Sequence, residues 1–530
     1  MLRSPISRTA AASVAFALAL TACAGGGKGN SRPGSAKGFS VAVGEPEHLT
    51  PGRTLVTLEP LRVLFAPLTK VDTKGRISYI QAESVTSSDS RHWTIKLRQG
   101  WTFHNGEPVT AANYADAWNQ AAYAPNAWVA NGQLANIEGY AALNPKKGKP
   151  VTKTLSGVKV VDPTTLEVTL TSPDSQFPLQ LTPNQVGFYP LPKAAFKDPT
   201  GYDRKPIGNG PFAMTAPWAK DKGATVTTFK AYRGTKPASS SITFKSYADL
   251  QTAYTDAQAG TTDVIGVPAS KLGQAKADFG KRLYTYDAPA LEFLGLPLYD
   301  KRFKDVRLRR ALSMAIDRAA VNKAIYGGLY TPATSLTPSS EVGAKTGICD
   351  ACRFDPAAAK QLLQEAGGWS GTMVITYPGG LGLDELYKAI ANQLRQNLGI
   401  HEVTAKPTSD WSEFSDKVFG KKVTGPYFGH WGALYPSMQN TLRGIFTKAG
   451  GCYVCSYYSD DDVDALLKQA DAATPEKAPE LYNRAQERIL QDFPVVPLYY
   501  GTYVYASTAQ VTGVVVGPAD VELDRISVVG

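Results

Sequence analysis

Residues 93–113 give the clearest indication of the architecture, with the sequence Trp93-Thr-Ile-Lys-Leu-Arg-Gln-Gly-Trp-Thr-Phe-His-Asn-Gly-Glu-Pro-Val-Thr-Ala-Ala-Asn113. Trp93, Ile95 and Leu97 alternate with polar residues, which predicts a β-strand with one buried face. Thr110 stands where a helix N-cap is needed, so we expect a helix over residues 111–122.

Strands and helices continue to alternate after this stretch. Leu166, Val168 and Leu170 alternate with polar residues, which predicts a second strand over residues 165–170. In the second half, caps, first-turn prolines and terminal glycines predict helices over residues 306–326, 356–366, 384–398 and 474–490. Two last strands are expected at 495–500 and 502–506. This order predicts an α/β fold with separate lobes.

The composition is typical of a water-soluble body. The chain has 530 residues, which is enough for two or three packed cores. Its apolar content is 43%, and no long apolar run follows the one at the N-terminus. Lys and Arg give a formal net charge of +10, but they are spread over the whole length. We therefore interpret the charge as a solvated surface and expect no nucleic-acid partner.

The N-terminus has the order of an export signal. Arg3 and Arg8 precede the apolar run of residues 10–20, and Leu20-Thr-Ala-Cys23 follows at its end. The run is too short to cross a bilayer. The tetrad resembles a bacterial lipobox, which implies a lipoprotein signal peptide at residues 1–22 and a lipid anchor on Cys23. The alternative is an ordinary cleaved signal. The Gly-rich residues 23–37 predict a flexible tether.

The remaining four cysteines form two Cys-x-x-Cys pairs, Cys349/Cys352 and Cys452/Cys455. Such pairs hold zinc or perform redox chemistry inside cells, but export favours oxidation to disulfides. We expect two structural disulfides, with pairing inside each motif favoured over pairing between them. A metal site and free thiols are the alternatives.

The residues of a hydrolase are not evident. The chain has five histidines and contains neither a His-Glu-x-x-His nor a Gly-x-Ser-x-Gly motif. The Gly-Lys-Gly run that resembles a phosphate loop falls in the tether. These histidines are His48, His92, His104, His401 and His430. We expect no catalytic residue, no metal and no cofactor.

Five segments in chain order resemble family 5 of the bacterial extracytoplasmic solute-binding proteins, the oligopeptide- and dipeptide-binding group. Residues 93–113 match its signature of a tryptophan, a strand, Leu-Arg-x-Gly and Phe-x-x-Gly-x-Pro-Val-Thr-Ala. The other four are Ile207-Gly-Asn-Gly-Pro-Phe212, Val306-Arg-Leu-Arg-Arg-Ala-Leu-Ser-Met-Ala-Ile-Asp-Arg318, Asp355-Pro-Ala-Ala-Ala-Lys-Gln-Leu-Leu-Gln-Glu-Ala-Gly367 and Pro494-Val-Val-Pro-Leu-Tyr499. We interpret these motifs as structural and not as ligand contacts.

The resemblance implies a two-lobed, periplasmic-binding-protein-like fold (type II, cluster C) with an extra subdomain in lobe one. Lobe one would comprise residues 38–290 and 496–530, with the subdomain at 75–200, and lobe two residues 291–495. The two crossings between the lobes are expected near residues 293–296 and 493–497, where glycine and prolines suit a hinge.

The resemblance also places a ligand cleft between the lobes. The cleft stretch of this family is Trp-x-Ala-Asp-Tyr-Pro, and its aspartate takes the free ammonium of a bound peptide. This chain has Trp431-Gly-Ala-Leu434-Tyr-Pro instead. Loss of that carboxylate is expected to weaken binding of a free N-terminus by about 2–5 kcal/mol.

Three explanations for Leu434 remain open. The ligand lacks a free amine there, as in a modified or cyclic peptide, a siderophore or an oligosaccharide; or Glu45 or Glu47 supplies the acid; or the chain is a paralogue with an altered ligand range. Aromatic and amide side chains near the altered position suit a stacking cleft. The predicted ligand-binding residues are Trp431, Leu434, Tyr435, Tyr503, Glu45, His48, Gln439, Asn440 and His430.

These expectations describe a monomeric, membrane-anchored receptor without enzymatic activity. It would capture a peptide or other small solute and deliver it to an ABC permease and its ATPase. A receptor used for sensing instead of import is the alternative.

Overall fold

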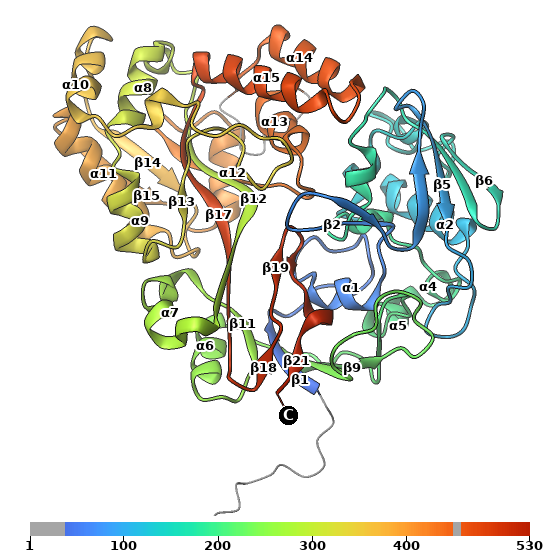
Figure 1. The fold of residues 1–530 in the computed structure, drawn as a ribbon. Coiled ribbons are helices and arrows are strands. Elements are labelled where there is room, and N and C mark those ends of the chain that lie inside the picture. Colours follow the sequence, from blue (N-terminus) through green and yellow to red (C-terminus); the bar gives the residue numbers. More distant parts are fainter. Residues whose placement is uncertain (1–37, 449–456, 530) are drawn as a thin grey trace, which may run out of the picture. The chain divides into compact units, whose positions relative to one another are not determined.

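One large sheet runs through the molecule. The computed structural model describes residues 38–448 and 457–529, and within them eleven strands form this sheet in the order β15-β14-β16-β12-β17-β11-β1-β10-β9-β8, with β13 beside β17. Its two longest strands, β12 (Leu283–Gly295) and β17 (Val495–Ser507), are antiparallel and lie side by side in Figure 1. The others are β15 (Val403–Pro407), β14 (Met373–Tyr377), β16 (Tyr427–Gly432), β11 (Val264–Gly266), β1 (Gly38–Val43), β10 (Ser241–Ser246), β9 (Gly223–Thr228), β8 (Phe212–Met214) and β13 (Thr331–Pro332).

The first hydrophobic core takes its residues from 39–264 and from 505–526. Beside the large sheet it includes a four-stranded sheet in the order β4-β5-β7-β6. Those strands are β4 (Ala82–Thr86), β5 (His92–Leu97), β7 (Thr165–Thr169) and β6 (Val158–Asp162). Three two-stranded sheets are formed by β2 (Thr69–Val71) with β3 (Ile77–Tyr79), β18 (Val511–Thr512) with β21 (Ser527–Val528), and β19 (Val516–Gly517) with β20 (Asp520–Val521). The helices of this half are α1 (Glu59–Leu64), α2 (Ala111–Ala122), α3 (Tyr140–Leu143), α4 (Ala194–Lys197), α5 (Pro199–Arg204), α6 (Leu250–Gln258) and α7 (Leu272–Phe279), and the last two pack mainly on a small separate cluster.

Residues 93–113 fold as predicted. Trp93, Ile95 and Leu97 are buried on β5, which pairs with β4 and β7. Thr110 and Asn113 form a capping box that satisfies orphan backbone donors at the start of α2. The aromatic stripe of α2 then packs into the first core, where Trp118 is completely buried. The predictions of this strand and this helix are confirmed.

The second core takes its residues from 272–504. Its helices are α8 (Val306–Met314), α9 (Arg318–Tyr326), α10 (Pro356–Glu365), α11 (Asp384–Leu398), α12 (Trp411–Phe419), α13 (Met438–Phe446), α14 (Asp461–Ala472) and α15 (Ala478–Asp492). The helices expected at 356–366 and 384–398 are confirmed as α10 and α11. Figure 1 shows α8, α9, α10 and α11 gathered beside the β14–β15 end of the sheet.

Three predicted boundaries are wrong. The single helix over 306–326 divides into α8 and α9, because the Asp317 side chain accepts from the Ala320 amide and starts a new helix. The last helix begins at Ala478 instead of residue 474, where Thr474 only forms a turn. The two strands expected at 495–500 and 502–506 form one continuous strand, β17.

The pairing of β12 with β17 is interrupted near its middle. Asp287 pairs with Thr502 and Leu291 with Tyr500, so residues 288–290 lie opposite Gly501 alone. A Cβ at Gly501 would lie 2.8 Å from the Cβ of Ala290, which requires glycine there. The irregularity lies a few residues from the crossings expected at 293–296 and 493–497. The lobe and subdomain boundaries stay predictions, which the separation of the two cores supports.

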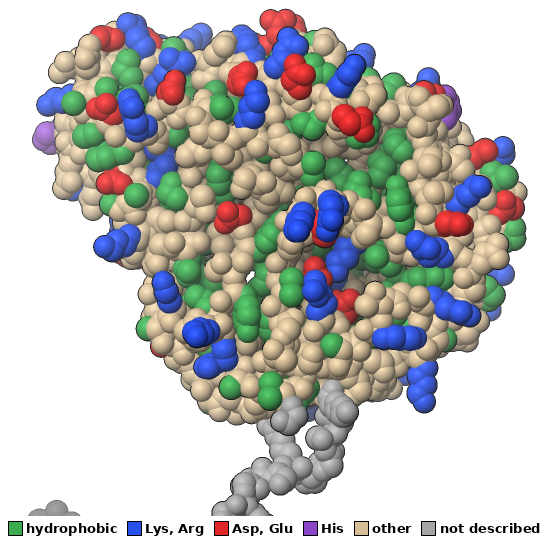
Figure 2. All heavy atoms as spheres, in the orientation of Figure 1, with side chains coloured by type: hydrophobic (Ala, Val, Ile, Leu, Met, Phe, Trp, Pro, Cys, Tyr) green, Lys and Arg blue, Asp and Glu red, His purple; other side chains and the backbone are tan. Residues whose placement is uncertain are grey.

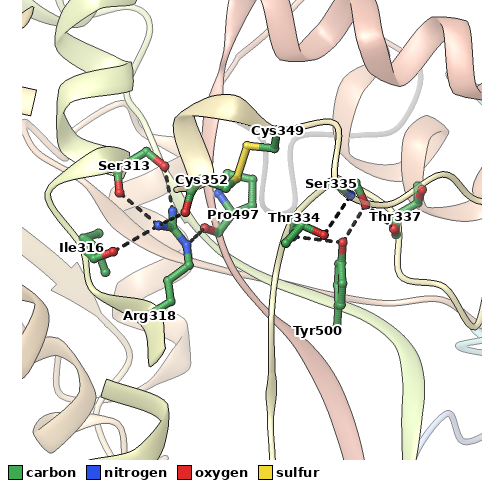
Figure 3. The surroundings of a disulfide bond; sticks show 11 residues. Ser313, Ile316, Arg318, Thr334, Ser335, Thr337, Cys349, Cys352, Pro497 and Tyr500 are labelled. Carbon is green, nitrogen blue, oxygen red and sulfur yellow. Dashed lines mark hydrogen bonds between the residues drawn. A yellow bond between two sulfur atoms is a disulfide. The ribbon is translucent and has the colours of Figure 1, made fainter. Parts of the chain in front are cut away.

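A disulfide stands inside the second core. Cys349 and Cys352 are joined with a Cα–Cα distance of 5.3 Å (Figure 3). Next to it, the buried Arg318 guanidinium donates to the carbonyls of Ser313, Ile316, Cys352 and Pro497. Arg318 therefore ties the end of α8, the disulfide loop and β17 together.

Several predictions lie outside the described residues. These are the signal peptide at 1–22, the anchor Cys23, the tether at 23–37 and the second cysteine pair, Cys452 and Cys455. No helix among the described residues has the length and apolar character that a membrane span requires.

Candidate functional site

The residues of the predicted cleft stretch lie at the end of β16 and the start of α13. The Trp431 indole Nε1 donates to Asn440 Oδ1 at 3.1 Å. Trp431 also packs closely on Gly444, where a Cβ would lie only 2.1 Å from the indole. Helix α13 thus fixes the orientation of this half-buried ring.

Leu434 stands in an apolar contact between the two halves of the chain. Leu434 and Tyr435 form a small cluster with Val71 of β2 and with Leu179. Val71 and Leu179 are far from Leu434 in sequence and belong to the half built around the first core. The position for which the family resemblance implies an aspartate is therefore occupied by a side chain that suits these apolar neighbours.

A buried polar network accompanies this contact. Gln439 Nε2 donates to Asp174 Oδ1 at 2.8 Å and to Asp471 Oδ1 at 2.9 Å, and the Tyr435 hydroxyl donates to Gln439 Oε1 at 2.7 Å. Burial, and then the charge of Asp471, raise the pKa of Asp174 to about 6. Arg443 forms an ion pair with Asp471. The network joins residues 174–180 to α13 and α14.

A cavity of about 390 Å³ lies beside the interrupted pairing of β12 and β17. It is lined by the turn after β2, by β12 and by the loop before Glu341, through Thr73, Thr285, Tyr286, Asp287, Ser339 and Ser340. Ser340 Oγ and Thr502 Oγ1 are buried and have no hydrogen-bond partner among the described residues. Unpaired buried hydroxyls are rare in native proteins, and of these two residues Ser340 lines the cavity.

The loop behind this cavity also reaches the Leu434 segment. Val342 donates its amide to the Pro436 carbonyl at 3.3 Å. Burial raises the pKa of the neighbouring Glu341 carboxyl to about 8. One Glu341 oxygen accepts from Thr441, and the other has no partner among the described residues. The cavity and the cleft stretch thus form one connected region.

Two predicted site residues lie elsewhere in the described chain. Glu45 accepts from Trp218 Nε1 and the Asp221 amide, both at 3.1 Å, and from the Ser246 hydroxyl. His48 pairs with Asp203 at 2.6 Å. Neither contacts the cleft stretch in this structure.

The other two lie on strands of the large sheet. His430 is exposed on β16, pairs with Glu292 of β12 in the ladder and stacks on Phe428. Tyr503 is half-buried, and it pairs in the ladder with Tyr286, which lines the cavity. Burial, and then the charge of Asp520, raise the pKa of Tyr503 to about 12.

Sequence reasoning missed Asp174, Asp287, Ser340 and Glu341. They come from separate segments, and no spacing in the sequence marks them as a group. Among the described residues, no three His, Cys, Asp or Glu side chains are grouped closely enough to hold a metal ion.

Comparison with known proteins defines the class. The family model described as bacterial extracellular solute-binding proteins, family 5 (middle part), matches residues 77–451, and the chain belongs to this family. It is 27% identical over 484 residues to the probable deoxycholate-binding periplasmic protein YgiS of Escherichia coli K12, and the alignment covers 86% of each chain. It is 26% identical over 466 residues to the glutathione-binding protein GsiB of Escherichia coli O1:K1 / APEC, and the alignment covers 84% of each chain.

The solved structures show the same fold. The periplasmic murein tripeptide-binding protein MppA, in its unliganded open form, superposes with a TM-score of 0.79 at 23% identity. The alignment covers 93% of this chain and 98% of MppA. The two-lobed α/β fold expected from the sequence is thereby confirmed.

Proposed function

We propose that this chain is the substrate-binding lipoprotein of an ABC importer, which captures an oligopeptide or peptide-like solute between its two lobes. The observation that carries the proposal is the cavity beside the paired crossing strands, which Asp287, Ser339 and Ser340 line with polar groups. Family membership supports the same role. Ligand binding would shift the population toward a closed form that the permease recognises.

The anchor is part of the proposal. The order of Arg3, Arg8, an apolar run and Leu20-Thr-Ala-Cys23 supports cleavage before Cys23 and lipidation of that residue. Intact-mass measurement of the protein from its own membranes tests this, and an unmodified Cys23 would contradict it.

The neighbours of Leu434 support a ligand without a free amine at that point. Leu434 packs with Val71 and Leu179, and Glu45 is occupied by Trp218 and its other partners. The two curated relatives are named for deoxycholate and for glutathione. Both peptide and non-peptide solutes therefore belong in a binding screen.

Native mass spectrometry of protein purified from its own host tests the proposed function. We expect a co-purifying small molecule that is released on unfolding and rebinds without chemical change. Turnover of peptides, esters or glycosides by the purified protein would contradict a pure binding role. Permease and ATPase genes next to this gene favour import, and their absence favours sensing.

A matched pair of substitutions tests the ligand chemistry. Leu434→Asp restores a carboxylate and is expected to improve the affinity for free-amine oligopeptides about tenfold or more, because a buried ammonium requires an opposing charge. Leu434→Asn has nearly the same shape without the charge and serves as the control. Calorimetry with a varied peptide pool measures both, and equal affinities would exclude this position as an ammonium site.

A further inference from the structure

A second, larger cavity lies wholly outside residues 283–504. Its volume is about 710 Å³, a size that suits a small organic ligand. The end of α1, the β2–β3 hairpin, residues 98–101 and 232–235, and the C-terminal segment 518–525 form its walls. Since none of these residues lies in the half built around the second core, the cavity does not depend on closure of the proposed lobes.

The walls combine rigid apolar surface with charge. Trp101 and Tyr232 meet edge to face with ring centroids 5.2 Å apart, and both line the cavity. Pro67, Pro183 and Pro211 add further apolar surface. Figure 2 shows basic and acidic side chains gathered beside an apolar area at the centre of one face of the molecule.

Most charges on these walls are paired. Arg62 binds Asp520 at 3.1 Å. Glu522 receives both Lys70 at 3.0 Å and Arg525 at 3.4 Å. These groups neutralise one another and give the cavity no strong preference for a charged guest.

Two guanidinium groups are exceptions. Arg98 donates to the backbone carbonyls of Ile80 and Tyr79 at 3.1 and 3.4 Å, and it has no carboxylate partner among the described residues. Arg233 has no hydrogen-bond or ion-pair partner in that part of the chain. Its Nη2 lies against Gly100, 3.5 Å from where a Cβ would stand. Asp524 is the one lining carboxylate without an ion pair there.

We propose that this cavity is a second binding site, which takes an organic anion with a planar apolar body. Arg98 and Arg233 would bind its carboxylate, sulfonate or phosphate group, because guanidinium forms strong charge-assisted hydrogen bonds to such oxygens. Trp101, Tyr232 and the prolines would contact the apolar body. The single unpaired carboxylate of Asp524 opposes this charge only in part.

Fluorescence titration with 8-anilinonaphthalene-1-sulfonate tests the proposal, with the uncharged N-phenyl-1-naphthylamine as the matched probe. We expect Arg98→Gln and Arg233→Gln each to weaken binding of the sulfonate about tenfold. Asp524→Asn is expected to strengthen it, since an opposing charge is removed. Arg353→Gln, an exposed arginine far along the chain, serves as the control and leaves the affinity unchanged.

The outcomes separate specific from general hydrophobic binding. The uncharged probe is expected to bind with the same affinity to the wild type and to every variant. The proposal would be overturned if the sulfonate affinity of Arg98→Gln and Arg233→Gln equalled that of the wild type. Absence of saturable sulfonate binding in the folded wild type would also overturn it. Asp287→Asn alters the other cavity and is expected to leave the sulfonate affinity unchanged. Solute binding at that cavity and sulfonate binding here are therefore measured separately, and failure of one is distinguishable from failure of the other.

Discussion

Arg318 shows how one buried charge organises its surroundings. Its side chain is almost completely buried and donates to four backbone carbonyls and to the Ser313 hydroxyl (Figure 3), and it has no ion-pair partner among residues 38–448 and 457–529. Burial lowers the pKa of Arg318 to about 10, so it stays charged at neutral pH. The Ser313 and Ile316 carbonyls also accept from backbone amides, so removing the side chain would take away the donor mainly from the carbonyls of Cys352 and Pro497.

We therefore expect Arg318→Ala to lower the free energy of unfolding by about 4 kcal/mol or more. Arg318→Lys should restore only part of this loss, because an ammonium cannot reach all the carbonyls that the planar guanidinium serves. Urea unfolding measures both. The control is Arg307→Ala, whose exposed pair with Asp305 is worth less than about 1 kcal/mol. A similar loss in both alanine variants would contradict this role.

At the scale of single residues, the sequence predicted what is decided locally. Thr110 and Asp355 cap helices as expected, because a cap needs only the residues that follow it within one turn. The contact of Leu434 with Val71 and Leu179 was not predictable in this way. It depends on how distant segments meet, which no local pattern encodes.

At the scale of elements, residues 174–180 meet α13 and α14 through a titratable network. The groups that face Asp174 are Gln180, Gln439, Tyr435, Tyr482, Asp471 and Arg443. The pKa of Asp174 is raised from 3.8 to about 6, so the folded state binds its proton more tightly than the unfolded state. The corresponding stability is complete below about pH 4 and is lost as the pH rises through 6.

Asp174→Asn should remove this dependence. We expect the difference in unfolding free energy, wild type minus variant, to fall by roughly 3 kcal/mol between pH 3.5 and pH 7. Urea unfolding across this range measures it. Asp162→Asn is the control, since hydrogen bonds from Thr164 and Thr165 lower the pKa of that exposed carboxyl and its difference should stay flat above pH 5. A flat difference for Asp174→Asn would show that its proton is not coupled to folding.

The disulfide loop gives a second prediction at this scale. Cys349 and Cys352 close a short loop, so chain entropy predicts that the double serine variant loses about 2 kcal/mol of stability. Thermal unfolding of the wild type with and without reductant provides the comparison. If reduction left the transition unchanged, the cross-link would contribute nothing to the folded state.

Helix boundaries were predicted less well than helix positions. Residues 306–326 keep one apolar periodicity throughout, yet the chain turns at residues 315–317 because Asp317 is a better cap than a helix-interior residue. The periodicity reports which face is buried, and it is unaffected by a change of helix direction. Competition between a cap and continued helix is decided by packing against the second core.

At the scale of the whole molecule, the two cores are joined in more than one place. Strands β12 and β17 connect them covalently. The cluster of Leu434 with Val71, and the bond of Gln439 to Asp174, add non-covalent contacts. The Ser175 amide also donates to the Asp471 carbonyl at 2.8 Å. Separation of the halves would break these contacts while leaving both cores folded.

Hydrogen exchange of the Ser175 amide therefore reports that separation. Gln439→Leu removes the bond to Asp174 that crosses between the halves. A hydrogen bond to a carboxylate is worth roughly 1.5–3 kcal/mol, so we expect exchange at Ser175 to accelerate about tenfold to a hundredfold. The amide of Thr376, bound to the Pro426 carbonyl inside the second half, should exchange as in the wild type.

Gln393→Leu is the matched control, because Gln393 holds the Asp317 amide within the second half and touches neither Asp174 nor Asp471. It should leave Ser175 protected. Equal protection of Ser175 in the Gln439→Leu variant and the wild type would mean that the Gln439–Asp174 bond adds nothing to the contact between the halves. In that case the Leu434 cluster and the Ser175–Asp471 bond would hold the halves together beside the crossing strands.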